Sequence, residues 1–133
     1  MSMLIKNMTF KAGQTLTVVG VIKPDPKRFE VNIGPSEDRI ALHFNPRFNS
    51  CGDINTIVCN SFEAGRWCEE KHERRFPFYR GQEFKVVIKF TLSEFVVTLP
   101  CRSTFCFPNR IGAEKYSVMS FIGDARIRSI EIK

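Results

Sequence analysis

Short segments in which apolar and polar residues alternate follow one another along the chain. In the clearest of them, Glu83 to Phe90, the residues Phe84, Val86, Ile88 and Phe90 share one parity. A two-residue period is that of a β-strand with one face on a core. No segment shows a convincing 3.6-residue stripe of the kind an amphipathic helix carries. The pattern therefore predicts an all-β protein.

Eleven strands are predicted, each bounded by residues that favour turns. They are Leu4 to Phe10, Gln14 to Ile22, Phe29 to Ile33, Ile40 to Phe48, Asn55 to Ser61, Trp67 to His72, Glu83 to Phe90, Glu94 to Leu99, Ser103 to Phe107, Ser117 to Ile122 and Ala125 to Ile132. Short strands at this spacing are typical of a sandwich of two antiparallel sheets. A chain of 133 residues can bury a hydrophobic core without disulfides, so we expect a single domain spanning residues 1–133.

The composition mainly argues against other classes of protein. The chain is 43% hydrophobic and 26% charged and has no apolar run of about 18 residues, so we expect no membrane insertion. The first residues, with Lys6 among scattered apolar positions, lack the continuous apolar segment of a secretory signal. The five cysteines are odd in number and have no CxxC spacing, which predicts free thiols and no metal site. No cofactor is expected.

The net charge of +6 does not predict nucleic-acid binding. Basic residues are spread along the chain, and the densest part, Arg66 to Arg80, also holds Glu69, Glu70 and Glu73. No recognition motif accompanies the charge.

Candidate chemistry is concentrated between Leu42 and Glu70. On a strand, His43, Asn45 and Arg47 point to one face, and Leu42 with Phe44 point to the core. Pro46 predicts a bulge or an edge at this end of the strand. Three hydrogen-bonding side chains are thus presented together.

These residues do not predict an enzyme. His43 has no Ser or Cys nucleophile motif beside it, and the adjacent Glu69 and Glu70 would face opposite ways on a strand. Gly-rich phosphate loops and metal-ligand clusters are also absent from the sequence.

A sugar-binding face fits the same residues better. Trp67 offers a flat apolar platform for the C–H face of a pyranose, and the polar side chains around it offer donors and acceptors for hydroxyls. Arg47 and Glu70 would hold each other in place by charge. Three alternatives remain open: Trp67 belongs to the core, His43 is a structural histidine, or Arg47 pairs with Asp53 in a turn.

Several motifs in this order resemble the carbohydrate-recognition domain of the galectins. They are His43-Phe44-Asn45-Pro46-Arg47-Phe48-Asn49, Gly52-Asp53, Asn55-Thr56-Ile57-Val58-Cys59-Asn60-Ser61, Trp67 with Glu70, Phe76-Pro77-Phe78, Phe107-Pro108-Asn109-Arg110 and Gly123-Asp124. The resemblance covers essentially the whole chain. A single domain of this length is similar to the prototype galectins, which are usually two-fold dimers.

The resemblance implies a jelly-roll sandwich that binds β-galactosides in a shallow groove on its concave face. It assigns His43, Asn45 and Arg47 to the axial 4-hydroxyl of galactose, Asn60 and Glu70 to the 6-hydroxyl, and Trp67 to the apolar face of the sugar. Arg47 and Glu70 would also reach the neighbouring glucose or N-acetylglucosamine. A glucose epimer would leave buried polar groups unpaired, which is the physical basis for its rejection.

The resemblance is less complete around the second sugar. Cys51 stands where the family often has a second His, and His72 stands where it usually has Arg. Supporting or second-sugar candidates are Cys51, Asp53, Val58, His72 and Arg74. His72 shares strand parity with Glu70 and would replace the Arg when protonated, so affinity should rise below about pH 6.5. Trp67 has the opposite parity, which requires a turn or bulge between Trp67 and Glu70.

The expected function is a non-enzymatic lectin that recognises lactose and N-acetyllactosamine glycans and cross-links them as a dimer. The alternative is a galectin-fold interaction protein with weak or lost sugar binding, prompted by Cys51 and His72. Apolar residues in both terminal strands either form the dimer contact or complete the core. The resemblance also implies a cytoplasmic protein that leaves cells by a route without a signal peptide.

Overall fold

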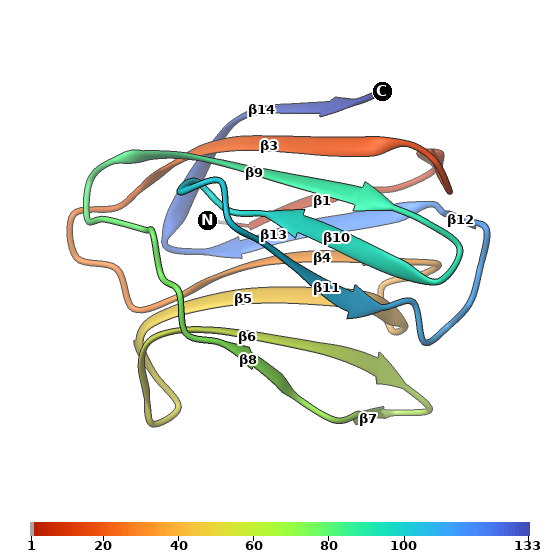
Figure 1. The fold of residues 1–133 in the computed structure, drawn as a ribbon, viewed down its shortest axis with the longest axis horizontal. Coiled ribbons are helices and arrows are strands. Elements are labelled where there is room, and N and C mark those ends of the chain that lie inside the picture. Colours follow the sequence, from red (N-terminus) through yellow and green to blue (C-terminus); the bar gives the residue numbers. More distant parts are fainter. Residues whose placement is uncertain (1) are drawn as a thin grey trace.

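Two antiparallel sheets make up the protein in the computed structural model, which describes residues 2–133 (Figure 1). The larger sheet has the order β1 (Ser2–Ile5), β13 (Val118–Gly123), β4 (Phe29–Gly34), β5 (Ile40–Ser50), β6 (Asp53–Glu63) and β7 (Arg66–Trp67), and β8 (Lys71–Glu73) also pairs with β6. The smaller sheet has the order β11 (Thr104–Pro108), β10 (Glu94–Thr98), β9 (Glu83–Phe90), β3 (Thr15–Ile22) and β14 (Ala125–Ile132). A short pair joins β2 (Phe10–Lys11) to β12 (Lys115–Tyr116).

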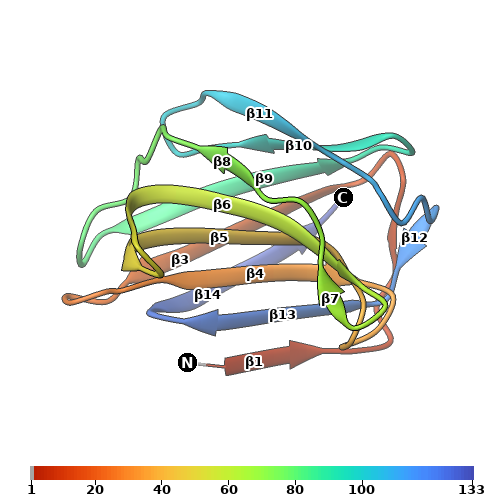
Figure 2. The ribbon, with the colours of Figure 1, turned by 90° about the horizontal axis from the view of Figure 1, so that it is seen from below.

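The predicted class is confirmed, because residues 2–133 contain strands and turns but no helix. It follows that no helix in this range is long and apolar enough to cross a membrane. Figure 2 shows β6, β5, β4, β13 and β1 side by side, with the strands of the other sheet behind them.

The core lies between the sheets and follows the predicted alternation. On β9, Phe84, Val86, Ile88 and Phe90 are all buried, and the residues between them are more exposed. On β5, Leu42 and Phe44 are fully buried, as their parity predicted.

The β5–β6 hairpin is longer than the sequence predicted. Both strands have 11 residues, and only Cys51 and Gly52 separate them. Both of these residues have positive φ angles, of 53° and 82°, and a two-residue turn with this backbone matches the twist of paired strands. The segment between the predicted strands is therefore mostly strand.

Two predicted strands are broken in the structure. The segment predicted as Leu4 to Phe10 stops after β1, and Asn7 has a φ of 57°, which ends an extended strand. The segment predicted as Trp67 to His72 divides into β7 and β8 because residues 68–70 leave the strand conformation. The second break supplies the turn that the parity of Trp67 and Glu70 required.

The prediction that Pro46 marks an edge or a bulge is wrong. β5 lies between β4 and β6, and Pro46 is opposite Ile57 in the regular part of the β5–β6 register. On the β4 side, the bridges run through Phe44 and resume at Arg47, so Asn45 and Pro46 are the two positions between them without a bridge. This short interruption accommodates the missing N–H of the proline.

Candidate carbohydrate-binding site

A groove of about 460 Å³ lies on the larger sheet. Its lining residues come from β4, β5, β6 and β7 and from the segments next to them: Arg28, Glu30, His43, Arg47, Cys51, Asp53, Val58, Asn60, Trp67 and Glu70. Five of the six predicted carbohydrate-binding residues line it, and Asn45 does not. Of the five supporting candidates, Cys51, Asp53 and Val58 line it, and His72 and Arg74 do not.

Strand register explains why these side chains meet. His43 is opposite Asn60 of β6 on one side and Asn32 of β4 on the other. Directly paired residues of adjacent strands point to the same face of a sheet, and so do residues two apart on one strand. The outer face of β4, β5 and β6 is therefore polar, and the opposite face forms the core.

Arg47 is held from two sides at one end of the groove. Its Nη1 donates to Asp53 Oδ2 at 2.8 Å, and its Nε donates to Asn45 Oδ1 at 2.9 Å. The predicted pairing of Arg47 with Glu70 is wrong, and the alternative turn ion pair with Asp53 is confirmed. The tight hairpin turn folds β6 back so that Asp53 lies beside Arg47.

Asn45 lies beneath the groove and is fully buried. Its Oδ1 accepts hydrogen bonds from Arg47 and from Arg28 Nη2, and its Nδ2 donates to the Phe29 carbonyl at 2.8 Å. In the unliganded protein its side chain therefore positions Arg47. Direct contact of Asn45 with a sugar stays a prediction.

Trp67 forms one wall of the groove. Its side chain is 48% exposed, and its ring lies 4.5 Å from that of His43 and 5.0 Å from that of Phe62. The alternative in which Trp67 belongs to the core is wrong. A half-exposed indole supported by an aromatic neighbour can receive the apolar face of a ligand.

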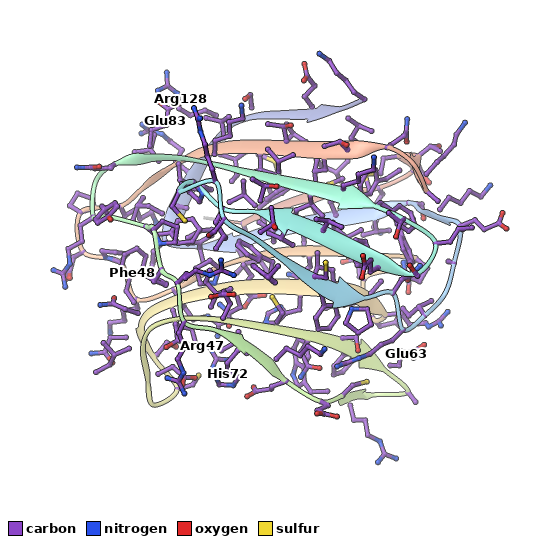
Figure 3. All side chains as sticks on the ribbon, viewed as in Figure 1. Arg47, Phe48, Glu63, His72, Glu83 and Arg128 are labelled. Carbon is purple, nitrogen blue, oxygen red and sulfur yellow. The ribbon has the colours of Figure 1, made fainter. Side chains whose placement is uncertain are left out.

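Glu70 and His72 contact each other at the rim, as their parity predicted. His72 Nε2 lies 3.0 Å from Glu70 Oε1, and both side chains are exposed to solvent. Arg47 and His72 lie toward the same end of the larger sheet, and Glu63 lies toward the other (Figure 3). Arg74 follows β8, is exposed and lies outside the groove.

His43 is almost fully buried although it lines the groove. Burial lowers the pKa of His43 from 6.5 to about 4, with Arg28 and Arg47 acting in the same direction and Glu30 opposing them. The imidazole is therefore neutral at pH 7. Its Nδ1 lies 2.6 Å from Asn32 Oδ1, so one ring nitrogen is engaged inside the sheet.

Two groove residues, Arg28 and Glu30, were missed from the sequence. They form an ion pair on the β4 side. The signal was present for Glu30, since it alternates with the apolar residues Phe29 and Val31 on a predicted strand. Which strand lies next to β5 cannot be read from that alternation.

Arg110 supports the groove from outside it and was also missed. Its Nη1 donates to Ser61 Oγ at 3.1 Å and to Asn60 Oδ1 at 3.3 Å, and its guanidinium lies over the Phe107 ring. No local sequence signal connects Arg110 to Asn60, because the two residues are 50 positions apart.

The groove has the opposite charge to the whole chain. Arg28 and Arg47 face Glu30, Asp53 and Glu70, which gives a net charge of −1 when His43 is neutral, whereas the chain carries +6. All five cysteines are free, as predicted, and residues 2–133 hold no cluster of metal-ligating side chains. The groove thus offers hydrogen bonds and one aromatic wall.

A sequence profile described as galactoside-binding lectin matches residues 2–132. The chain belongs to this family. The lectin is 48% identical to a beta-galactoside-binding lectin of Electrophorus electricus, over 96% of this chain and 95% of that protein. Membership confirms the galectin resemblance and makes the protein a carbohydrate-binding protein and not an enzyme.

Solved structures of the family have the same fold as this lectin. The crystal structure of galectin-1-L2 from Dario rerio is 55% identical, with a TM-score of 0.96 over 98% of this chain and 99% of that one. CG-16, a homodimeric agglutinin from chicken liver, is 38% identical, with a TM-score of 0.95 over the whole of both chains. Lactose- and MES-liganded congerin II is 34% identical, with a TM-score of 0.94 over the whole of both chains. The predicted jelly-roll sandwich is confirmed.

Proposed function

We propose that this protein is a lectin that binds β-galactosides of the lactose and N-acetyllactosamine type in the groove on β4, β5 and β6. The observation that carries the proposal is the half-exposed Trp67 ring next to His43, with Arg47 and Asn60 in the same groove. One aromatic wall with fixed donors and acceptors beside it is the arrangement that a pyranose requires. The solved congerin II structure with lactose supports the choice of ligand.

Galactose stacks its apolar face on Trp67. His43 and Arg47 hold the axial 4-hydroxyl, which projects from the ring toward β5. Asn60 and Glu70 hold the 6-hydroxyl on the side of β6. An equatorial 4-hydroxyl cannot reach the same partners, so glucose would leave His43 and Arg47 desolvated without a ligand hydroxyl.

The second sugar lies toward Arg47 and Glu70. Both side chains line the groove, and each has a partner that holds it: Asp53 for Arg47 and His72 for Glu70. Cys51 and Val58 complete this end of the lining.

We also propose that the protein is a homodimer that cross-links glycoconjugates. The terminal strands β1 and β14 form edges of the two sheets, and Leu4 and Ile122 are exposed on β1 and its neighbour β13. Exposed apolar edges favour association, and the chicken relative is described as homodimeric. Two grooves per dimer would raise avidity for multivalent glycans.

We further propose that the protein is present both in the cytoplasm and outside cells, by a route without a signal peptide. The support is its five unpaired thiols, which are typical of proteins that fold in a reducing compartment. Fractionation of expressing cells and their medium tests this proposal.

Chromatography on immobilised lactose tests the sugar specificity. We expect the folded protein to be retained and to be eluted by free lactose but not by cellobiose, whose terminal 4-hydroxyl is equatorial. Flow-through without retention, or equal elution by both sugars, contradicts the proposal.

A further inference from the structure

Three polar side chains form a connected row across β4 and β5, namely Glu30, Asn32 and His43, and Ser120 of β13 also contacts Asn32. Asn32 Nδ2 lies 3.1 Å from Glu30 Oε1 and 3.0 Å from Ser120 Oγ. The other side of the same amide, Oδ1, lies 2.6 Å from His43 Nδ1. Asn32 and His43 are both buried, and Glu30 is mostly buried, so water competes little for these bonds.

The chemistry of each group gives the row a direction. A carboxylate only accepts hydrogen bonds, so the amide edge facing Glu30 is the donating NH₂. The opposite edge of the Asn32 amide is then the carbonyl oxygen, which also only accepts. His43 Nδ1 must therefore carry the hydrogen, and the nearby Glu30 Oε1, at 3.6 Å from Nδ1, is likewise an acceptor.

We infer that Glu30 and Asn32 are positioning residues that hold His43 in the tautomer with hydrogen on Nδ1, so that Nε2 accepts a hydrogen bond from the bound sugar. The role of Nε2 toward a galactoside rests on the proposed function. The tautomer itself does not, since it follows from contacts in the protein without ligand.

The charged groups around His43 keep the imidazole neutral, which the tautomer requires. Arg28 and Arg47 oppose a positive charge on the ring, and Glu30 is the one nearby acid that favours it. Glu30 forms an ion pair with Arg28, which offsets part of its effect on His43. Burial decides the outcome, and the pKa of His43 falls to about 4.

The tautomer makes His43 complementary to Arg47. A guanidinium only donates, so a hydroxyl held by Arg47 accepts from it and must direct its own hydrogen elsewhere. With Nδ1 protonated, His43 Nε2 provides the acceptor. With the other tautomer, both protein groups would donate to one hydroxyl, whose own hydrogen would have no acceptor between them.

Long-range ¹H–¹⁵N NMR of the sugar-free protein at neutral pH tests the inference, because the two tautomers give different ring nitrogen shifts. We expect the Nδ1–H form to be the main form of His43 in the wild type. We expect Asn32→Ala to lower the share of the Nδ1–H form, because Nδ1 then keeps only the more distant Glu30 carboxylate as an acceptor. We expect the same variant to weaken lactose binding about tenfold. Wild-type protein with Nε2–H, or an unchanged tautomer in folded Asn32→Ala, overturns the inference.

Conservative variants separate positioning from a merely structural role. Asn32→Asp keeps an acceptor at Nδ1 and should retain the Nδ1–H form, but the added carboxylate should raise the pH at which His43 becomes protonated. Glu30→Gln can donate as well as accept, so it should give a mixture of tautomers, whereas the exposed Glu37→Gln should leave the wild-type spectrum unchanged. If the wild-type tautomer is as inferred and lactose does not bind, the proposed function fails and the tautomer assignment stands.

Discussion

At the residue scale, the groove combines side chains with opposite solvent exposure. Trp67 is half-exposed and is free to receive a ligand, whereas His43 is buried and already has one protein partner. The cost of burying His43 is limited because it stays neutral. This arrangement makes the stability of the protein depend on pH through His43.

Stability should fall in mild acid because of His43. Its pKa is about 4 in the folded state and 6.5 ordinarily, so between these pH values the unfolded chain binds a proton that the folded protein does not. The free energy of unfolding should decrease by about 3 kcal/mol from pH 7 to pH 4 through this group. The dependence on pH fades as the pH rises above 6.5, where His43 is neutral in both states.

Urea unfolding at a series of pH values measures this effect. His43→Gln should remove most of the decrease between pH 6.5 and 4, and the matched variant of the exposed histidine, His72→Gln, should retain it. If the free energy of unfolding falls equally with pH in both variants, the assignment to His43 is contradicted.

His72 should tune affinity rather than stability. It lies 3.0 Å from Glu70 Oε1 at the rim of the groove, on a side chain that is exposed to solvent. His72→Arg supplies a permanent charge, so lactose affinity at pH 7.5 should rise about twofold to threefold, within the range of exposed ion pairs. Calorimetric titration of both proteins with lactose at pH 7.5 measures the difference.

Lys71→Arg is the control for this variant, because it makes a neighbouring exposed cation an arginine without changing the Glu70 contact. Equal lactose affinities of the wild type and His72→Arg rule out the role of His72.

Much of the groove could be predicted at this scale because strand parity places His43 and Arg47 on one face of the sheet and Leu42 and Phe44 on the other. Strand parity does not say how deeply a side chain is buried, so the burial of Asn45 beneath Arg47 was not predicted. It also says nothing about the neighbouring strand, so Arg28 and Glu30 were missed. The sequence left both Glu70 and Asp53 open as partners of Arg47, because the Arg47–Asp53 pair crosses a turn whose length the sequence did not define.

At the element scale, turns decide which residues reach the groove. The two-residue turn at Cys51–Gly52 brings Asp53 to Arg47. The break in the strand after Trp67 allows both the Trp67 indole and the Glu70 side chain to line the groove. Alternation predicted where strands run but not where they stop. The boundaries depend on local backbone geometry, such as the positive φ at Asn7, that residue type alone does not fix.

The close approach of β4 and β5 makes Gly34 indispensable. A Cβ at this position would lie 2.0 Å from the Arg39 carbonyl oxygen, which is backbone and cannot rotate away. Gly34→Ala should lower the free energy of unfolding by about 3 kcal/mol. Gly13→Ala is the control: its φ is 97° but its surroundings are open, so it should cost about 1 kcal/mol. Urea unfolding compares them, and equal losses contradict the steric account.

At the scale of the whole molecule, the chain ends occupy edges of both sheets and the groove lies on strands in the interior of one sheet. The alternation of apolar residues and the turn spacing predicted the sandwich. They could not distinguish a terminal strand that completes the core from one that contacts a second chain, because both need apolar residues. The structure leaves Leu4 of β1 exposed, which favours the second role.

Leu4→Lys should therefore weaken the dimer without affecting each groove. Loss of one apolar contact on each chain should raise the dimer dissociation constant at least about tenfold. Sedimentation equilibrium measures it, and Leu92→Lys, an equally apolar exposed position away from β1 and β14, is the control. A wild-type monomer, or equal effects of the two variants, contradicts this interface.

The central claim is that the groove walled by Trp67 binds a β-galactoside, and titration of the folded protein with lactose in a calorimeter tests it most directly. We predict heat that fits one lactose per chain, with a dissociation constant of millimolar or below, no such heat for Trp67→Ala, and wild-type heat for Tyr79→Ala, another exposed aromatic residue outside the groove. Absence of heat from folded wild-type protein at millimolar lactose contradicts the account.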